Sequence, residues 1–234
     1  MKIDFAAKVA MVAGGTGGLG RAVSLAFLEE GAKVVVPYHS EQEFSELRSA
    51  AGREAQLIGR AVDVLNEGAV ARLVEEIGRI DVLVNTVGGY VGGVELWKLA
   101  PAEFDRMLNL NLRAGYLLAR AVVPGMLERG QGAVVNVSAK AALDHGAGAS
   151  AYAASKAAAL AMMDSLAAET RGRGVRVNSV LPSIIDTKAN REAIPDATFD
   201  AWPKPEDIAK VILFLASDAA KVVHGAAVTV YGDS

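Results

Sequence analysis

A tyrosine and a lysine stand four residues apart in the segment Tyr152–Lys156, which reads YAASK. On a helix this spacing puts both side chains on one face, one turn apart. An ammonium beside a phenol is the pair that moves a proton at a carbonyl-like carbon. The ordinary pKa of a phenol is about 10, so acid–base chemistry near neutral pH needs a depression of roughly 3 units. We expect Lys156 to supply it from a position close to Tyr152 in a partly dry site, although a plain helix can carry the same spacing.

A second feature is a glycine-rich turn near the start of the chain. Gly14, Gly18 and Gly20 follow a β-rich run and precede a helical pattern, with Thr16 and Leu19 in the same turn. Glycine lets the backbone turn tightly and approach a pyrophosphate, whose charge then faces the N-terminus of the helix. A glycine string alone also fits a flexible turn, but its position here predicts a dinucleotide site.

Polar residues and glycines follow two further β-rich runs. Asp63 is suited to accept a hydrogen bond from an adenine amino group, or to cap the helix that begins near Glu67. The loop at 85–93 is rich in glycine, and we expect it to pass under the cofactor and to border the substrate. The candidate contacts in these two loops are Asp63, Val64, Asn85, Gly88, Gly89 and Tyr90.

These residues need elements to position them, and the chain alternates between β-rich and helical patterns. The β-rich runs are Val9–Ala13, Lys33–Val36, Gln56–Val62, Val82–Asn85, Ala133–Ser138, Val175–Val180 and Ala226–Val230. The helical patterns are Leu19–Glu30, Glu41–Ala50, Glu67–Gly78, Pro101–Arg129, Ala151–Arg171 and Pro205–Ala216. This alternation predicts an α/β fold: a single Rossmann-type domain over residues 1–234, with a doubly wound parallel sheet of about seven strands. Such sheets bind ligands beyond the carboxyl ends of their strands, where the candidate residues fall.

The composition narrows the range of partners. The chain has 234 residues and a net charge of −3, which gives no reason to expect nucleic acid or an anionic membrane. It has no cysteine and only three scattered histidines, so we expect neither a disulfide nor a metal site. The first apolar run reads as a strand rather than a signal peptide, and no apolar stretch approaches the ~20 residues of a membrane span. We therefore expect a cytoplasmic protein that acts on a small molecule.

Several motifs together resemble those of the short-chain dehydrogenase/reductase family, from about Val9 to Gly232. They are Gly14-x-x-x-Gly18-x-Gly20, Asn85–Gly88, Asn111 and Tyr152-x-x-x-Lys156. The resemblance implies hydride transfer between a nicotinamide dinucleotide and a small organic substrate, and assembly as a homodimer or homotetramer. It makes Tyr152 the acid–base and Lys156 the residue that holds the nicotinamide ribose. It makes Asn111 the residue that organises a water in the proton relay.

The same resemblance assigns the segment that begins at Pro182. That segment matches the part of the family that binds the nicotinamide carboxamide, with Ile185 and Thr187 in the contact positions. Residues 184–205 are then expected to form a substrate lid with Trp202 as an apolar cover. The alternative is that they form a plain surface connection.

One position departs from the family pattern. The substrate-orienting serine of the family usually lies thirteen residues before the tyrosine, and this chain has Ala139 there. Ser138 can serve if the chain bulges; otherwise it merely ends its strand, because a slip of one residue turns a side chain to the other face. Loss of such a donor costs about 2.7–4 kcal/mol of transition-state stabilisation. We expect a substrate that does not need this hydroxyl, with Ala139 as a candidate contact. His145 faces either this substrate or the solvent.

A narrower resemblance accounts for the missing serine. Between Gly88 and Trp202 the chain is similar to quinonoid dihydropteridine reductase, a branch that also lacks the serine and relies on the tyrosine and the lysine. A quinonoid pterin is an activated, conjugated acceptor and needs less oxyanion stabilisation than a ketone. Pterin reduction is therefore one alternative. Another, of a different class, is a redox sensor that binds dinucleotide without turnover, but the retained Tyr152, Lys156 and Asn111 argue against it.

The end of the second β-rich run bears on the choice of cofactor. NAD-preferring members normally place an acidic residue there to bind the ribose diol. Here the segment Val36–Ser40 reads VPYHS and contains no acid, and Ser40 or His39 can donate to a 2′-phosphate. Neither Arg nor Lys stands in this segment, and Gly17 occupies a position where NADP enzymes often carry a basic residue. On balance we expect NADP(H) rather than NAD(H).

Overall fold

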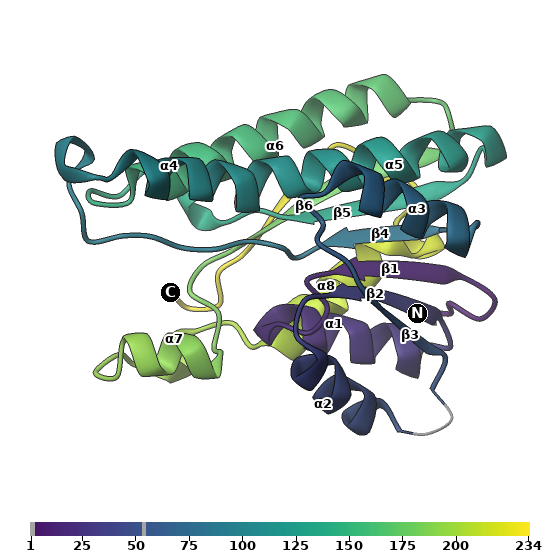
Figure 1. Ribbon diagram of the computed structural model, residues 1–234, viewed down its shortest axis with the longest axis horizontal. Coiled ribbons are helices and arrows are strands. Elements are labelled where there is room, and N and C mark those ends of the chain that lie inside the picture. The colour runs from purple at the N-terminus through teal and green to yellow at the C-terminus, as the bar shows by residue number, and fades with distance from the viewer. Residues whose placement is uncertain (1–2, 53–54) are drawn as a thin grey trace.

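The computed structural model describes residues 3–52 and 55–234 and contains one parallel sheet of seven strands (Figure 1). The strands are β1 (Val9–Ala13), β2 (Lys33–Tyr38), β3 (Leu57–Ala61), β4 (Val82–Asn85), β5 (Gly132–Val137), β6 (Val175–Pro182) and β7 (Ala227–Val230). They lie in the order β3-β2-β1-β4-β5-β6-β7 with all neighbouring pairs parallel. The order reverses between β1 and β4, so the carboxyl ends of these two strands flank the crevice where such sheets bind ligands.

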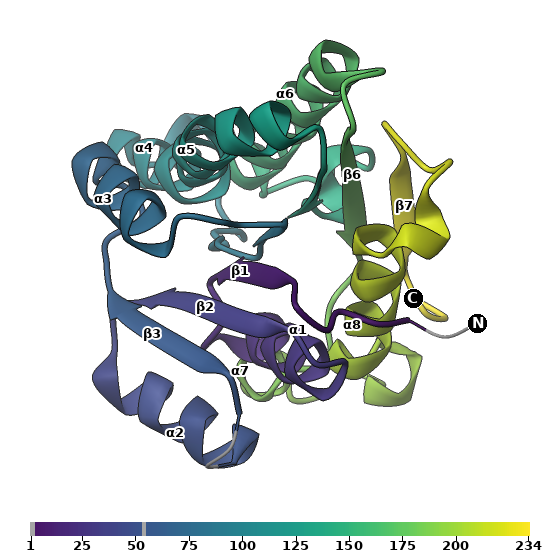
Figure 2. The same ribbon diagram turned by 90° about the vertical axis from the view of Figure 1, so that its right-hand side faces the viewer.

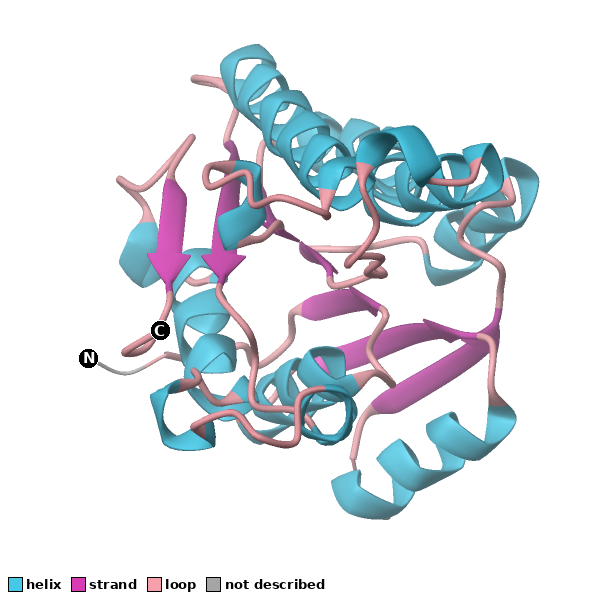
Figure 3. Ribbon diagram, turned by 90° about the vertical axis from the view of Figure 1, so that its left-hand side faces the viewer, coloured by secondary structure: helices cyan, strands magenta, loops and turns pink. Residues whose placement is uncertain are grey.

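Helices cover both faces of the sheet. They are α1 (Gly18–Glu29), α2 (Glu41–Ala51), α3 (Glu67–Ile77), α4 (Pro101–Leu108), α5 (Ala114–Arg129), α6 (Ser150–Thr170), α7 (Lys188–Ala193) and α8 (Pro205–Ala216). Helices α3 to α6 form the layer above the strands in Figure 2, and α1, α2 and α8 form the layer below. Figure 3 shows the strands running between these layers. No helix in residues 3–52 and 55–234 is both long and apolar enough to cross a membrane.

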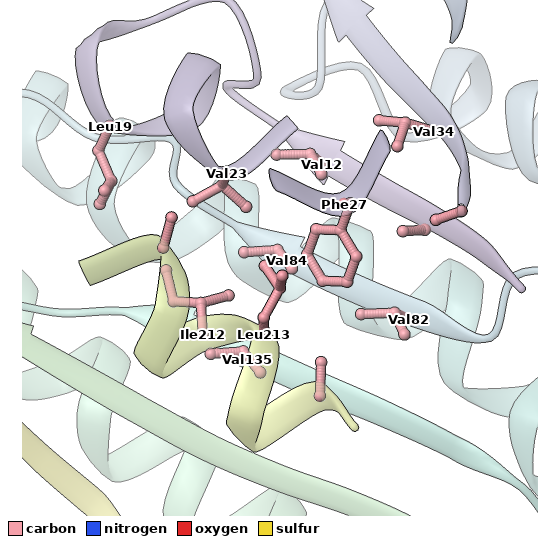
Figure 4. Close-up of a cluster of buried hydrophobic side chains, with 14 of the residues drawn as sticks. Val12, Leu19, Val23, Phe27, Val34, Val82, Val84, Val135, Ile212 and Leu213 are labelled. Carbon is pink, nitrogen blue, oxygen red and sulfur yellow. The ribbon is translucent and has the colours of Figure 1, made fainter. Parts of the chain in front are cut away.

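Alternate residues of the buried strands pack into two cores. Val12 of β1 packs with Val23 and Phe27 of α1, and Ile212 of α8 belongs to the same cluster (Figure 4). Met11, its neighbour in β1, points to the opposite face and joins the core beneath α3, α5 and α6. A strand that is buried on both faces needs apolar residues at consecutive positions, and these strands have them. Each large side chain buried in this way contributes about 1.5–3 kcal/mol.

The element boundaries predicted from the sequence agree with the structure within two residues, with two exceptions. The single helix predicted over 101–129 is divided, because α4 ends at Leu108 and α5 begins at Ala114. A π-helical turn, Asn109–Arg113, lies between them. Such a turn adds one residue to the helical repeat without interrupting it, so an apolar pattern does not reveal it. The second exception is α7, a short helix within the expected lid.

Candidate active site

The glycine-rich turn lies directly against the loop that follows β4. The main-chain N–H and the hydroxyl of Thr86 both donate to the carbonyl of Ala13, at 2.9 and 2.8 Å, which joins the ends of β1 and β4. Gly14 has a φ of +78°, which is unfavourable for residues with a Cβ. A Cβ at this position would also lie 2.7 Å from Oγ1 of Thr86. The turn therefore requires glycine here in order to lie against the Thr86 loop.

A cleft of about 240 Å³ opens beside this turn. It is lined by Gly14, Thr16, Gly17, Pro37, Tyr38, His39, Glu43, Val62, Asp63, Val64, Leu65, Thr86, Val87, Gly88 and Leu110. A Cβ on Gly18 would lie 2.8 Å from Cγ2 of Thr187, and one on Gly88 would lie 2.8 Å from Oδ1 of Asn111, so neither position has room for a side chain. Bare backbone at the N-terminus of α1 suits a pyrophosphate, and the residues present fit a dinucleotide. When bound, a nicotinamide dinucleotide supplies or accepts the hydride.

Tyr152 and Lys156 lie one turn apart on α6, as their spacing predicts. Lys156 is 6% exposed, and its Nζ donates to the carbonyl of Val137 at 3.0 Å. Burial lowers the pKa of Lys156 to about 8. Burial, followed by the proximity of Tyr90, raises the pKa of Tyr152 to about 12. The expected lowering of the Tyr152 pKa is therefore wrong for the chain by itself, because the phenol is desolvated while the ammonium bonds to Val137.

This arrangement suits Tyr152 to proton donation. A phenol with a raised pKa keeps its proton at neutral pH, so it can protonate a substrate that is being reduced. In the oxidative direction the phenol would first have to lose that proton. The free-energy cost of this ionisation is about 1.4 kcal/mol for each unit by which the pKa exceeds the working pH. The positive charges of Lys156 and of an oxidised nicotinamide ring both favour that loss.

The end of β5 places no free serine hydroxyl beside Tyr152. Ser138 is 3% exposed, and its Oγ donates to the carbonyl of Lys156 at 3.0 Å. Its main-chain N–H donates to the carbonyl of Val180 at 2.9 Å, so the ladder with β6 continues without the bulge that a catalytic role would need. The structure therefore corrects the assignment of Ser138 as a substrate-orienting residue. Ala139, at the serine position, is itself 6% exposed.

Asn111 lies in the π-helical turn and joins the 88–93 loop to α6. Its side-chain amide accepts from the N–H of Gly89 at 2.9 Å and donates to the carbonyl of Gly89 at 3.0 Å. It also donates to Oγ of Ser155 at 2.9 Å, and that hydroxyl donates to the carbonyl of Tyr152 at 2.8 Å. These bonds occupy the amide, so a water relay through Asn111 has to use its main-chain carbonyl. That relay stays a prediction.

Two residues that were predicted to contact the cofactor have side chains that contact other parts of the protein. Asn85 donates to Oδ1 of Asn136 at 2.9 Å and accepts from the N–H of Val87 at 3.2 Å. It therefore shapes the loop after β4 and does not reach into the cleft. The side chain of Leu19 is buried in the core beneath α1, which leaves only its main chain to contact a ligand.

The rim of the cleft at β2 and α2 differs from the sequence-based expectation. Oγ of Ser40 accepts from the N–H of Glu43 at 3.3 Å and so caps α2. Nε2 of His39 lies 3.7 Å from Oδ1 of Asp63, whose carboxylate also accepts from a neighbouring main-chain N–H. Oγ1 of Thr16 donates to Oε2 of Glu43 at 2.8 Å. The residues that line the cleft therefore include two carboxylates, Glu43 at the start of α2 and Asp63 after β3, although the segment Val36–Ser40 has none.

On the substrate side, Tyr90 borders the reactive phenol. Tyr90 is 65% exposed, and its ring meets the ring of Tyr152 edge-on with centroids 4.9 Å apart. His145 is exposed, with Nε2 lying 3.2 Å from the carbonyl of Ala142. Trp202 is only 7% exposed and packs against Phe199, so it anchors the segment 184–205 and does not offer an open ring face to a substrate.

The segment after β6 folds back toward the glycine-rich turn. Oγ1 of Thr187 accepts from the N–H of Asn190 at 3.2 Å and caps α7, while the methyl group of Thr187 faces Gly18. The side chain of Asn190 donates to the carbonyl of Ile185 at 2.8 Å. Pro182 ends β6 just before this segment. Contact with the carboxamide and closure over a substrate stay predictions.

The comparisons with known proteins agree with this geometry. A family model described as short chain dehydrogenase matches residues 8–198. The chain belongs to the short-chain dehydrogenase/reductase family. Like the enzymes of this family, it is an NAD(P)-dependent oxidoreductase.

Relatives within the short-chain dehydrogenase/reductase family differ in their substrates. The chain is 33% identical to the 3-oxoacyl-acyl-carrier-protein reductase FabG of Thermotoga maritima, over 96% of both chains. It is 35% identical to the D-threitol dehydrogenase of Mycolicibacterium smegmatis, over 96% of this chain and 92% of that one. A solved structure described as an NAD(P)-dependent gluconate 5-dehydrogenase from Beutenbergia cavernae, with NADP bound at low occupancy, is 29% identical. It superposes with a TM-score of 0.88 and covers 98% of this chain and 97% of that chain.

Two residues of this family member were not among those singled out from its sequence. Ser155 links Asn111 to the main chain of Tyr152, and its place inside the YAASK segment was the available signal. Glu43 reaches the glycine-rich turn through Thr16. The pattern Ser40-x-x-Glu43 marks the start of a helix and was the available signal for Glu43. It does not tell which way the carboxylate turns.

Proposed function

We propose that this short-chain dehydrogenase/reductase reduces an activated, conjugated acceptor, and that a quinonoid dihydropterin is the first such acceptor to test. The observation that carries the proposal is the end of β5. Ala139 stands at the serine position, and the hydroxyl of Ser138 is bonded to the carbonyl of Lys156. Such a site lacks the β5 donor to a developing oxyanion. An acceptor that spreads its charge over a conjugated ring needs that donor less than a ketone does.

The proposed roles follow from the contacts around Tyr152. Tyr152 donates the proton, which its raised pKa keeps in place at neutral pH. Lys156 holds the nicotinamide ribose and favours ionisation of Tyr152 once the proton has been transferred. The substrate lies between the 88–93 loop, with Tyr90 against Tyr152, and the lid at 184–205. Asn111 keeps that loop in place through Gly89.

The substrate class rests on this chain's own residues. The resemblance to quinonoid dihydropteridine reductase that the sequence suggests between Gly88 and Trp202 favours pterin reduction, while the family match covers short-chain dehydrogenases as a whole. The curated relatives named above carry other substrates in their names, so pterin chemistry does not follow from them.

We also propose that the protein is a homodimer or homotetramer. Phe104 on α4 and Tyr116 on α5 are 39% and 46% exposed, and α6 exposes small residues at Ala154 and Ala161. Exposed aromatic side chains beside a helix of small residues suit close packing against a second copy. Light scattering on the peak that elutes from a gel-filtration column gives the molar mass, and therefore the number of subunits in the assembly.

The substrate proposal is tested by mixing the protein with NADH, and separately with NADPH, and quinonoid dihydropterin generated in place. Loss of the near-ultraviolet absorbance of the reduced nicotinamide is followed, with the uncatalysed rate subtracted. The matched variant is Ala139→Ser, which restores a hydroxyl at the family position. We expect the wild type to reduce the pterin rapidly and simple ketones slowly. We expect Ala139→Ser to raise ketone reduction at least about tenfold while changing pterin reduction little.

Two results would overturn this substrate assignment. One is a wild type that reduces ketones as fast as the pterin. The other is an absence of pterin turnover in a protein that binds the dinucleotide, and imines and quinones would then be the next acceptors to measure.

A further inference from the structure

At the end of β2, the side chain of Tyr38 is held against α2. Tyr38, the last residue of the strand, stacks on Phe44 of α2 with ring centroids 4.6 Å apart and an interplanar angle of 6°. The hydroxyl of Tyr38 donates to the carboxylate of Glu41. The carboxylate of Glu41 is thus bonded to Tyr38, and Glu41 is not among the residues that line the cleft.

Glu43 supplies a carboxylate from α2. It is the third residue of this helix, and its N–H is bonded to the side chain of the cap residue, Ser40. A glutamate at this place commonly turns its carboxylate back to the N–H of the cap residue. Here the carboxylate accepts the hydroxyl hydrogen of Thr16, which is 27 residues away in the glycine-rich turn. Glu43 and Thr16 both line the cleft, so this hydrogen bond holds a negative charge at its wall.

The charges around this wall do not suit a 2′-phosphate. A phosphate monoester carries about −1.5 to −2 charges near neutral pH and is bound in proteins by Arg and Lys. Among the described residues that line the cleft, Glu43 and Asp63 are acidic and none is Lys or Arg. His39, which lines the same wall, lies beside Asp63. Arg21 on α1 is directed to Glu46, with their closest atoms 3.9 Å apart.

A ribose diol fits the same wall. The two hydroxyl groups of an unphosphorylated ribose are donors, and a carboxylate is an acceptor with two oxygens. Thr16 donates to Oε2 of Glu43 and so fixes the orientation of the group. In NAD-binding sheets of this type an acidic residue performs this task from the end of the second strand. In this chain the corresponding carboxylate comes from the first turn of α2.

We infer that Glu43, positioned by Thr16, selects NAD(H) over NADP(H) in this enzyme. The carboxylate accepts hydrogen bonds from the adenosine ribose and repels a phosphate at its 2′ position. This reverses the preference expected from the segment Val36–Ser40. The inference concerns the dinucleotide alone and does not depend on the substrate class.

The test is direct binding without any acceptor. Isothermal titration of the wild type with NADH and with NADPH gives two dissociation constants, and the thermal shift with each ligand gives an independent readout. We expect NADH to bind at least about tenfold more tightly, since a hydrogen bond to a charged group is worth about one to two decades of affinity. Glu43→Gln keeps a favourable residue at the start of α2. In this variant we expect the ratio of the NADPH dissociation constant to the NADH dissociation constant to fall by about tenfold or more. Thr16→Val should move it in the same direction, because the carboxylate loses its anchor.

The matched control is Glu29→Gln. It removes an equal charge from the last residue of α1, an exposed position that does not line the cleft and lies at the end of the helix away from the glycine-rich turn. We expect the ratio of its two dissociation constants to stay within about threefold of wild type, since distant exposed charges are screened by salt. The inference is overturned if wild type binds NADPH at least as tightly as NADH, or if Glu43→Gln behaves like Glu29→Gln. It is also overturned if the folded wild type binds neither dinucleotide.

Discussion

At the scale of single residues, Lys156 is a functional group that destabilises the fold near neutral pH. It is 6% exposed, and burial lowers its pKa from 10.5 to about 8. The folded state therefore binds fewer protons than the unfolded chain between pH 8 and about 10.5. By linkage, stability rises with pH through that window, and the full penalty, about 3 kcal/mol, is present below pH 8. One hydrogen bond to Val137 offsets part of it.

This predicts the behaviour of Lys156→Met. We expect the variant to lose most turnover and yet to be more stable than wild type at pH 7, by about 1–3 kcal/mol in the free energy of unfolding. The difference should shrink as the pH rises from 8 to 10, because wild type is then relieved of the buried charge. Urea unfolding curves at several pH values measure it. Lys210→Met, at an exposed lysine of α8, is the control and should stay within about 0.5 kcal/mol at each pH. A Lys156→Met variant that is less stable at pH 7 would contradict this account of the site.

At the scale of elements, the site depends on the contact between the glycine-rich turn and the start of α7. Gly18 begins α1, and a Cβ there would lie 2.8 Å from Cγ2 and 3.2 Å from Cβ of Thr187. Thr187 in turn caps α7 with its hydroxyl. Two segments that are far apart in the chain are therefore fitted to each other beside the cofactor cleft.

The contact can be tested by a double-mutant cycle. Gly18→Ala alone should destabilise the protein by about 1–3 kcal/mol, because the added methyl group overpacks the contact. Thr187→Ser removes the methyl group that is hit and keeps the capping hydroxyl, so by itself it should cost little. In the Thr187→Ser background we expect Gly18→Ala to cost less than half as much. Thermal unfolding of the four proteins measures this, and equal costs in both backgrounds would show that the two segments are not in contact.

The elements also show where sequence patterns stop being informative. Strand limits such as Val9–Ala13 follow from consecutive apolar residues with turn residues beyond them, and they were predicted correctly. The π-helical turn at Asn109–Arg113 was missed, because the apolar repeat runs through it. Helix α7 was missed, because it is too short to show a repeat and exposes both of its ends.

At the scale of the whole molecule, the strand order explains why scattered motifs form one site. The reversal between β1 and β4 brings Gly14 next to Thr86. The adjacency of β4, β5 and β6 brings Val137 beneath Lys156 and carries the chain to Thr187. Strand and helix alternation was enough to predict this fold, because parallel crossovers leave few topologies.

The directions of individual side chains were less predictable from the sequence. Ser138 and Trp202 are suitable residue types in suitable segments, but one is bonded to the backbone of α6 and the other is buried against Phe199. The carboxylate of Glu43 has two possible partners, the main-chain N–H at the cap of α2 and the hydroxyl of Thr16. Local patterns do not distinguish them, because the second partner is set by the packing of α2 against the glycine-rich turn.

The central claim is that Tyr152 is the proton donor in hydride transfer from a bound nicotinamide dinucleotide. The most direct test compares wild type with Tyr152→Phe, measuring dinucleotide affinity and the rate of hydride transfer to an acceptor on the same samples. We predict an affinity within about threefold of wild type and a rate at least about a hundredfold lower, the range in which acid catalysis contributes. A Tyr152→Phe variant that transfers hydride at the wild-type rate would contradict the claim. So would a wild type that binds the dinucleotide tightly and reduces none of the pterin, quinone, imine or ketone acceptors, which is the behaviour of a redox sensor.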